Sequence, residues 1–262
     1  MPKVRILFLF LDAGMQKQVV EFLGPVYSVS SELISCSLAG LKTKDLYFQI
    51  EQAMLRNPFD FLLVEFSDRL EMFDGMKRRI AIDFDSDKIN YNRKILAKDP
   101  FLRAIGKSRN RVLDLSAGLG IDAVFLAQNG HQVVALERNP LLYLLLNMAA
   151  RRSKRLLNSP LKFEFSEGVS YIEKNVRPSD FDCIYFDPMF PDKSKKALPK
   201  QEMVLFRQLV GSDHDAQTVV LAALSTKTRV VVKRPIGSVP IVAKPSNSFE
   251  SKLVRFDIYE GK

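Results

Sequence analysis

Histidine and cysteine are scarce in this chain, which has only two of each among 262 residues. His131 and His214 stand far apart, and neither has acidic residues or cysteines at the spacing that is typical of metal ligands. A zinc enzyme needs several such ligands, and a Ser-His-Asp hydrolase needs a histidine that is paired with an acid. The sequence therefore disfavours both classes, and we expect no metal site.

The two cysteines, Cys36 and Cys183, are also far apart, and they fit neither a disulfide framework nor a zinc-binding pattern. Cys183 lies inside an apolar run, where a small buried hydrophobic side chain is its expected role. We therefore assign no chemistry to either cysteine.

Long hydrophobic runs are absent as well. No apolar stretch reaches the roughly 18 to 20 residues that a membrane-spanning helix needs. The segment VRILFLFL (4–11) also lacks the length and the small-residue cleavage site of a signal peptide. We therefore expect a cytoplasmic protein with no membrane partner.

Positive charge, in contrast, is plentiful. With 39 Lys and Arg against 30 Asp and Glu, the formal net charge is +9. Such an excess suggests an anionic partner if the charges gather on one face, although a solvated surface explains it as well. A composition of 47% hydrophobic and 26% charged residues is that of a globular protein with a real core.

The pattern of apolar residues divides the chain into two parts. Residues 1–90 predict a small N-terminal α/β unit, with strands at 3–12, 60–66 and 76–84 and a helix at 43–57. Residues 91–262 predict a larger domain with a helix at 92–106, strands at 111–116, 131–137, 161–168, 182–188, 228–235 and 252–261, and helices at 121–130, 140–157 and 200–211. This alternation implies an α/β fold with a mostly parallel sheet, which binds its ligands beyond the carboxyl ends of the strands.

A glycine loop follows the first strand of the larger domain. In DLSAGLGIDA (114–123), Gly118 and Gly120 let the backbone approach a ligand, and Asp122 adds a polar group at the start of the next helix. Nineteen residues after Gly118, the next strand ends in Glu137, which is well placed to accept both hydroxyls of a ribose. An ordinary tight turn beside a solvated acid is the alternative, but loop and acid together favour a nucleoside cofactor.

The loop alone does not decide which cofactor binds. Gly118, Gly120 and Ala123 satisfy the dinucleotide pattern G-x-G-x-x-[GA], so an NAD-dependent oxidoreductase is one interpretation. Asp114 favours another, because a carboxylate inside the strand ahead of the loop suits the ammonium group of S-adenosylmethionine (SAM). Glu167, after the third strand, is placed either to accept a hydrogen bond from the adenine amino group or to cap the following helix.

A second cluster follows the strand at 182–188, where DPMF (187–190) resembles the [DN]-P-P-[FY] signature of methyltransferases that act on exocyclic amino groups. The lone pair of a base amine is delocalised, so the amine is a poor nucleophile until acceptors hold its hydrogens. Asp187 and the carbonyl of Pro188 can be these acceptors, Asp187 can also take the proton, and Phe190 offers a ring on which the base can stack. The alternative is a strand that simply ends in a proline turn.

Basic residues gather at the same predicted end of the sheet. They are Lys193, Lys195, Lys196 and Lys200, which follow Phe190, and Lys233 and Arg234 at the end of the strand at 228–235. A charge run is ordinarily a solvated face. Several basic residues that converge on one catalytic edge are better interpreted as phosphate contacts beside a bound RNA nucleotide.

Over roughly residues 102–259, the sequence resembles the family of small-subunit ribosomal RNA guanine-N2 methyltransferases often called RsmJ. The segments that carry the resemblance are SAGLGIDA, LERNP, DPMFPDKSKKALPKQEM, LVGSDHDA, VVVKRP and RFDIY. The resemblance implies a Rossmann-like class I SAM-dependent methyltransferase that modifies the exocyclic N2 amine of one guanosine near the 3′ end of 16S rRNA. The 16S rRNA or the small ribosomal subunit would be its partner, and we expect a monomer.

The resemblance also implies which residues contact the methyl donor. They are Ile121, Asp122, Glu137, Arg138, Glu167, Gly168 and Asp187. Family members usually have Arg where this chain has Ile121, and residues 1–90 correspond to the family only loosely. Two other hypotheses stay open at this point, namely an NAD-dependent oxidoreductase and a basic RNA-binding protein without activity.

Overall fold

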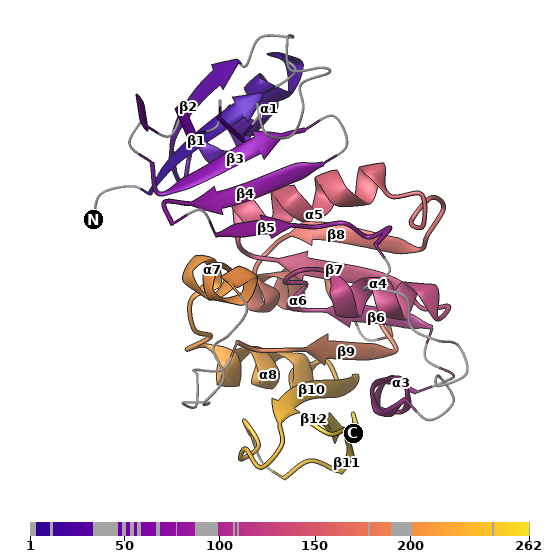
Figure 1. Cartoon of the computed structure of the whole chain (residues 1–262). Helices are drawn as coiled ribbons and strands as arrows, with labels where there is room; N and C mark the ends of the chain where they lie inside the picture. Colours follow the sequence, from indigo (N-terminus) through magenta and orange to yellow (C-terminus); the bar gives the residue numbers. More distant parts are fainter. Residues whose placement is uncertain are drawn as a thin grey trace. The chain divides into compact units, whose positions relative to one another are not determined.

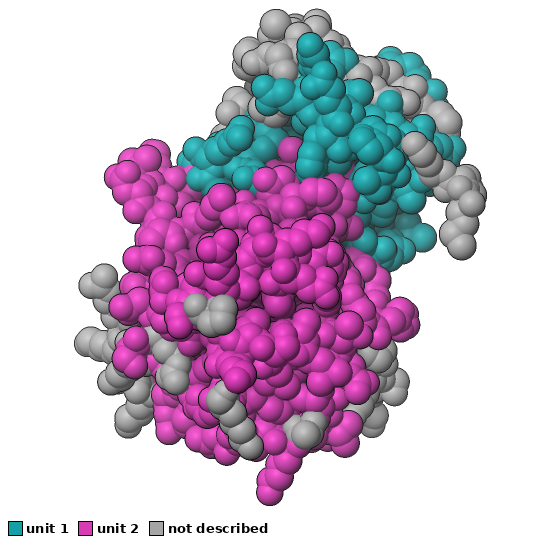
Figure 2. Space-filling model, turned by 180° about the vertical axis from the view of Figure 1, so that it is seen from behind, with its two compact units in different colours: residues 1–83, 147–152, 195–209 teal, residues 84–146, 153–194, 210–262 magenta. Residues whose placement is uncertain are grey.

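The computed structural model of the chain describes residues 4–10, 13–33, 47–48, 51–52, 55–56, 59–66, 69–76, 78–86, 99–106, 108, 110–177, 179–189, 201–242 and 244–261. The chain forms two compact units (Figure 2). One comprises residues 1–83, 147–152 and 195–209, and the other comprises residues 84–146, 153–194 and 210–262. Each unit has a β-sheet of its own (Figure 1).

The first unit contains a five-stranded sheet of order β2-β1-β3-β4-β5. Its strands are β1 (Arg5–Phe10), β2 (Ser28–Leu33), β3 (Phe61–Glu65), β4 (Leu70–Asp74) and β5 (Arg79–Ala81). Helix α1 (Ala13–Leu23) connects β1 to β2, and β1 is parallel to both of its neighbours, whereas β3, β4 and β5 are antiparallel. The core of this unit consists of the buried side chains of Leu7, Leu9, Leu62, Val64, Phe66 and Phe73.

Strands β1, β3 and β5 confirm three of the predicted segments, but β4 was not predicted because acidic residues interrupt its apolar pattern. Glu71 and Asp74 are nevertheless buried, since arginines neutralise them. Arg69 Nε lies 2.6 Å from Glu71 Oε1, and Arg78 forms an ion pair of 2.6 Å with Asp74. The helix predicted at 43–57 falls mostly outside the described residues.

The second unit contains a seven-stranded sheet of order β11-β12-β10-β9-β6-β7-β8. Its strands are β6 (Arg111–Asp114), β7 (Gln132–Glu137), β8 (Leu161–Phe165), β9 (Cys183–Phe186), β10 (Arg229–Pro235), β11 (Asn247–Glu250) and β12 (Val254–Tyr259). The five strands from β8 to β10 are parallel, and β12 and β11 extend the sheet in antiparallel fashion. This arrangement confirms the predicted mostly parallel sheet, and it pairs β9 with β6.

Helices follow the strands along the chain. They are α3 (Pro100–Ile105), α4 (Ile121–Gln128), α5 (Pro140–Arg152), α6 (Gly168–Asn175), α7 (Gln201–Val210) and α8 (Ala216–Ser225). On one face of the seven-stranded sheet, Ile172 of α6 and Val219 of α8 join the strand residues in a single core. On the other face, Phe101 of α3 packs its ring against Phe125 and Tyr185. The sheet is therefore covered on both faces, as expected for an α/β fold.

Because β6 to β10 are parallel, their carboxyl ends share one edge of the sheet, where the glycine loop between β6 and α4 also lies. Gly118 and Gly120 have φ angles of 56° and 75°, in the left-handed region that favours glycine. At Gly120 the space is also closed, since a Cβ atom there would lie 2.8 Å from Leu146 Cδ2 and 2.9 Å from Phe84 Cζ. The loop conformation therefore depends on this glycine for two separate reasons.

Within the described part of the chain, no helix has both the length and the apolar character to cross a membrane.

The closed space around Gly120 predicts a specific stability loss. Gly120→Ala should lower the free energy of unfolding by about 1 to 3 kcal/mol more than Gly130→Ala, because overpacking is added to the backbone strain. Gly130 is the matched control, since its φ is also positive at 91° but a Cβ there would meet nothing within 4 Å. Chemical denaturation of the two variants measures the difference, and equal losses would show that the loop relaxes freely.

Candidate active site

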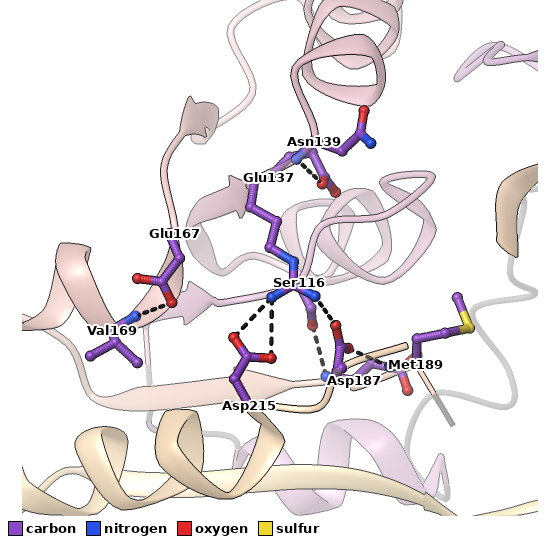
Figure 3. A network of polar contacts seen from close by, with 10 residues as sticks. Ser116, Glu137, Asn139, Glu167, Val169, Asp187, Met189 and Asp215 are labelled. Carbon is purple, nitrogen blue, oxygen red and sulfur yellow. Dashed lines mark hydrogen bonds and ion pairs between the residues drawn. The ribbon is translucent and has the colours of Figure 1, made fainter. Parts of the chain in front are cut away.

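Five parallel strands bring polar side chains to one edge of the second unit. Asp114 ends β6, Glu137 ends β7, and Asp187 directly follows β9. Glu167 comes shortly after β8, and Lys233 lies near the end of β10. The close view in Figure 3 shows Ser116, Glu137, Glu167 and Asp187 gathered at this edge. The structure thus brings together the two sites that the sequence predicted separately, on the glycine loop and after β9.

Glu137 ties the glycine loop to the end of β7. Its carboxylate accepts hydrogen bonds from Gly118 N at 3.0 Å and from Asn139 N at 2.7 Å. Only 5% of the residue is exposed, and this burial raises the pKa of Glu137 to about 7 against the opposing effect of the backbone N–H groups. Each carboxylate oxygen has two lone pairs, so each oxygen of Glu137 can accept a ribose hydroxyl in addition to its backbone N–H.

Asp114 lies deeper than its predicted role requires. It is 1% exposed, and its carboxylate accepts a hydrogen bond of 2.9 Å from Ser116 N. Burial raises the pKa of Asp114 to about 8, with Asp122 and Asp187 adding to the effect, so the group is largely protonated at neutral pH. Its hydrogen bond with Ser116 N shapes the start of the glycine loop, and its contact with the ammonium group of SAM stays a prediction.

Asp187 lies at the centre of a small charge cluster. Lys233 Nζ is 2.8 Å from Asp187 Oδ2 and 2.9 Å from Asp122 Oδ2, and the hydroxyl of Tyr185 donates to Asp122 Oδ2 at 2.7 Å. Burial raises the pKa of Asp187 to about 6, while the ammonium of Lys233 opposes that rise. The backbone N–H of Asp187 donates to Ser116 Oγ at 2.8 Å, which fixes this residue beside the glycine loop.

A second ion cluster was not predicted from the sequence. Arg138 pairs with both Asp213 and Asp215, and Asp213 Oδ2 also accepts a 2.6 Å hydrogen bond from the backbone N–H of Met189. Arg138 follows β7, whereas the two aspartates precede α8, so the cluster joins two separate segments of the chain. The sequence signal for this cluster was the motif LVGSDHDA. This motif supported the family resemblance, but it suggested no role for its aspartates.

Glu167 is the N-cap of α6. Its carboxylate accepts hydrogen bonds from Val169 N at 3.0 Å (Figure 3) and from Ser170 N at 2.8 Å. These are the contacts expected of the capping role that the sequence also suggested. Burial alone would raise the pKa of Glu167, but the two backbone N–H groups hold it below its ordinary value. Gly168, the first residue of α6, is buried beneath the cap.

The remaining predicted residues occupy several environments. Ile121 is the first residue of α4 and is 44% exposed, so the side chain in the position of the family's arginine faces solvent at the edge. Pro188 is buried directly after Asp187. The predicted stacking ring of Phe190 and the predicted phosphate contacts at Lys193, Lys195, Lys196 and Lys200 lie outside the described residues.

Lys233 and Arg234, which were predicted as phosphate contacts, both have partners within the protein. Lys233 is engaged by the carboxylates of Asp122 and Asp187, so its charge is already neutralised within the protein. Arg234 is only 7% exposed and donates a hydrogen bond to the carbonyl of Val239. Neighbouring residues in a strand point to opposite faces, so at most one of the two faces a ligand at this edge, and the phosphate contact stays a prediction.

Acidic side chains outnumber basic ones at this edge among the described residues. The acids are Asp114, Asp122, Glu137, Glu167, Asp187, Asp213 and Asp215, and the bases are Arg138 and Lys233. A dinucleotide would bring its negative pyrophosphate into this field, whereas SAM brings a positive sulfonium and an ammonium group. The edge therefore fits SAM better than NAD. No group of three His, Cys, Asp or Glu side chains that suits a metal ion occurs in the described part of the chain.

Comparisons with known proteins agree with this fit. The sequence pattern of SAM_MT, a family of SAM-dependent methyltransferases, matches residues 48–261. Ribosomal RNA small subunit methyltransferase J of Bdellovibrio bacteriovorus is 43% identical over 194 residues, which cover 71% of this chain and 76% of that protein. The protein of the same name from Thioalkalivibrio sulfidiphilus is 38% identical over 195 residues, which cover 69% and 75%.

A solved structure extends the similarity to the fold as a whole. The crystal structure of a SAM-dependent methyltransferase from Neisseria gonorrhoeae aligns with 98% of this chain and 96% of its own, with a TM-score of 0.63 and 23% identity. The aligned part includes residues 1–90, which the sequence related only loosely to the family. The N-terminal sheet is therefore part of a fold that the two proteins share.

The two roles considered for Glu167 can be separated by substitution. Glu167→Ala should lower the free energy of unfolding by about 0.5 to 2 kcal/mol, because the first turn of α6 loses its cap. Glu167→Ser should restore most of that loss, since serine caps helices well but is too short to reach a ligand. Denaturation measures the cap, and calorimetry with SAM measures the adenine contact. A loss of SAM affinity in the stable serine variant would show that Glu167 also binds the donor.

Proposed function

The chain belongs to the ribosomal RNA small subunit methyltransferase J family, and from this premise we propose that it methylates the exocyclic N2 amine of a guanosine in 16S ribosomal RNA. SAM is the methyl donor of the family. The names of the relatives specify small-subunit ribosomal RNA as their substrate. The site after β9 supports an exocyclic base amine as the acceptor, and the choice of guanine N2 rests on the family resemblance. Membership of this family argues against the two other hypotheses, an NAD-dependent oxidoreductase and an RNA-binding protein without activity.

The choice of an exocyclic amine as the methyl acceptor rests on the position of Asp187 and Pro188. β9 pairs with β6, so the acceptor residues after β9 lie beside the glycine loop after β6. Two hydrogen bonds hold them in register, from Leu115 N to Tyr185 O at 2.9 Å and from Asp187 N to Ser116 Oγ at 2.8 Å. A base amine held by Asp187 is thereby presented to a donor held by the loop.

The acceptors of this chain perform a definite task in such a transfer. When bound, SAM supplies a methyl group on a positively charged sulfur, so that attack by the amine nitrogen breaks the sulfur–carbon bond, returns its electron pair to sulfur and leaves one surplus proton on nitrogen. Asp187 holds the amine hydrogen before the transfer and accepts that proton afterwards. Its pKa of about 6 leaves it ionised near neutral pH and makes it a stronger base than an ordinary aspartate.

The donor side of the site is assigned to the residues of the glycine loop and to the ends of β7 and β8. Glu137 accepts the ribose hydroxyls, and Gly118 and Gly120 allow close approach of the backbone. Arg138, next to Glu137, is held in place by its ion pairs with Asp213 and Asp215. RNA contacts at the lysines between 193 and 200, stacking on Phe190, a monomeric state and action in the cytoplasm all stay predictions.

The proposed reaction is tested directly on rRNA. Small-subunit rRNA from a strain that lacks the gene should be deficient in N2-methylguanosine, and treatment with the enzyme and SAM should restore it. Mass spectrometry of the nucleosides identifies the methylated base, and digestion into oligonucleotides locates it. Methylation of another base, or of another atom of guanine, would refute the choice of the amine but not the family.

Glu137 should contribute strongly to donor affinity. Glu137→Gln keeps the shape of the side chain but removes its charge, and SAM binding should weaken by about 1.5 to 3 kcal/mol, the range for a charge-assisted hydrogen bond. Isothermal titration calorimetry measures the affinity. Glu164→Gln is the control, because Glu164 forms an ion pair with Lys162 on β8 but takes no part in the site. Unchanged SAM affinity in folded Glu137→Gln would remove Glu137 from the donor site.

Asp187 should act on the rate more than on binding. Asp187→Asn replaces one acceptor oxygen with a donor and removes the charge that offsets the developing cation, so single-turnover methylation should slow by about 100-fold or more at saturating SAM. Asp180→Asn, at an exposed acid that precedes β9, should leave the rate unchanged. If Asp187→Asn runs within a few-fold of the parent, the acceptor lies elsewhere.

A further inference from the structure

Four side chains of the second unit form a continuous chain that ends at Asp187. The hydroxyl of Tyr185 donates to Asp122 Oδ2 at 2.7 Å. Lys233 Nζ donates to the same oxygen at 2.9 Å and to Asp187 Oδ2 at 2.8 Å. These residues come from β9, from the first turn of α4 and from β10. Of the four, Tyr185 alone was not predicted at the site, whereas Asp122 was expected to contact the donor and Lys233 a phosphate of the RNA.

The sheet places Lys233 where it is. In the parallel pairing of β10 with β9, Val232 lies opposite Phe186, so the next residue of each strand, Lys233 and Asp187, are also neighbours. The side chain of Lys233 is 24% exposed, and both of its described partners are carboxylates. The strand register, rather than a flexible surface position, therefore determines this ion pair.

In this group of side chains, the carboxylates of Asp122 and Asp187 share one cation, the ammonium of Lys233. Carboxylates that approach each other without a cation between them cannot both stay ionised at little cost, because each disfavours the charged form of the other. Lys233 neutralises them together, and Tyr185 adds a hydrogen bond that anchors Asp122. Burial lowers the pKa of Lys233, but the two carboxylates outweigh that effect and raise the pKa above its ordinary value, so the lysine stays charged and is not itself a proton carrier.

We propose that Lys233 is a positioning residue, whose ammonium, shared with Asp122 and anchored through Tyr185, keeps Asp187 ionised and orients it toward the guanine amine. This inference rests on the proposed function. Lys233 occupies Oδ2 of Asp187, which, among the described contacts, leaves Oδ1 to accept the amine hydrogen and then the proton. Asp122 weakens the effect of Lys233 on Asp187, because it competes with Asp187 for the same ammonium.

Within the described part of the chain, the other charged groups that act on Asp187 do so in the opposite sense to Lys233. Asp122 from α4, Asp213 from the segment before α8 and the buried Asp114 of β6 are acids. Lys233 is thus the cation that offsets them, and its removal and the removal of Asp122 should have opposite effects on the ionisation of Asp187. A role that was only structural would not produce opposite effects.

The pH profile of single-turnover methylation, at saturating SAM and rRNA, tests this inference. The parent rate should fall as the pH drops through about 6, where Asp187 becomes protonated. Lys233→Met should move this acid limb to higher pH by about 1 unit or more, since an opposite charge at this distance shifts a carboxyl group by about 1 to 3 units. Asp122→Asn should move the limb to lower pH, because Lys233 is then left to Asp187 alone.

Two further variants complete the test. Lys233→Arg should return the limb toward its parent position, because the charge is restored. Lys162→Met is the control, since it removes an exposed lysine that is also ion-paired, with Glu164, and should leave the profile unchanged. If Lys233→Met fails to fold, the downward shift in Asp122→Asn decides the question alone.

The outcomes separate this inference from the function on which it rests. A parent enzyme that forms no N2-methylguanosine at any pH would refute the proposed function. A parent that forms it, with acid limbs in Lys233→Met and Asp122→Asn that coincide with that of the parent, would overturn the role of Lys233 and leave the function standing. Shifts of both variants in the same direction would also overturn it.

Discussion

The parallel pairing of β9 between β6 and β10 is the constraint on which the rest of the site depends. Asp114 lies opposite Tyr185 across one pairing, and Val232 lies opposite Phe186 across the other. Backbone hydrogen bonds alone therefore bring the glycine loop, Asp187 and Lys233 to one edge. A shift of one residue in either pairing would turn the side chains to the opposite face and would separate the acceptor from its cation.

The edge also has to hold many carboxylates close together, and it does so in three ways. Asp114 is largely protonated because it is buried, Glu137 and Glu167 accept hydrogen bonds from backbone N–H groups, and the remaining acids form ion pairs with Lys233 and Arg138. An acid-rich edge of this kind suits a positively charged donor. RNA, which is anionic, requires positive charge elsewhere, so donor and substrate make opposite electrostatic demands on neighbouring parts of one surface.

The sequence was informative wherever a residue type is tied to its own backbone. Alternating apolar segments predicted the parallel strands, Gly118 and Gly120 predicted the loop, and Asp187 was placed correctly after β9. What depends on contacts between distant segments was not predictable. The pairing of Arg138 with Asp213 joins residues 75 positions apart, and Lys233 was predicted as a phosphate contact because its ion pair with Asp187 depends on the register of two distant strands.

The packing around Gly120 has a consequence for how related sequences can vary. Leu146 and the ring of Phe84 fill the space that a side chain at position 120 would take, and Phe84 is itself stacked on Phe163 of β8. A larger residue at 120 would require smaller residues at 84 and 146, so these positions are free to change only together. Phe84 is therefore coupled through packing to the glycine loop, although it takes no part in the chemistry. In related sequences, substitutions at positions 84, 120 and 146 should occur together.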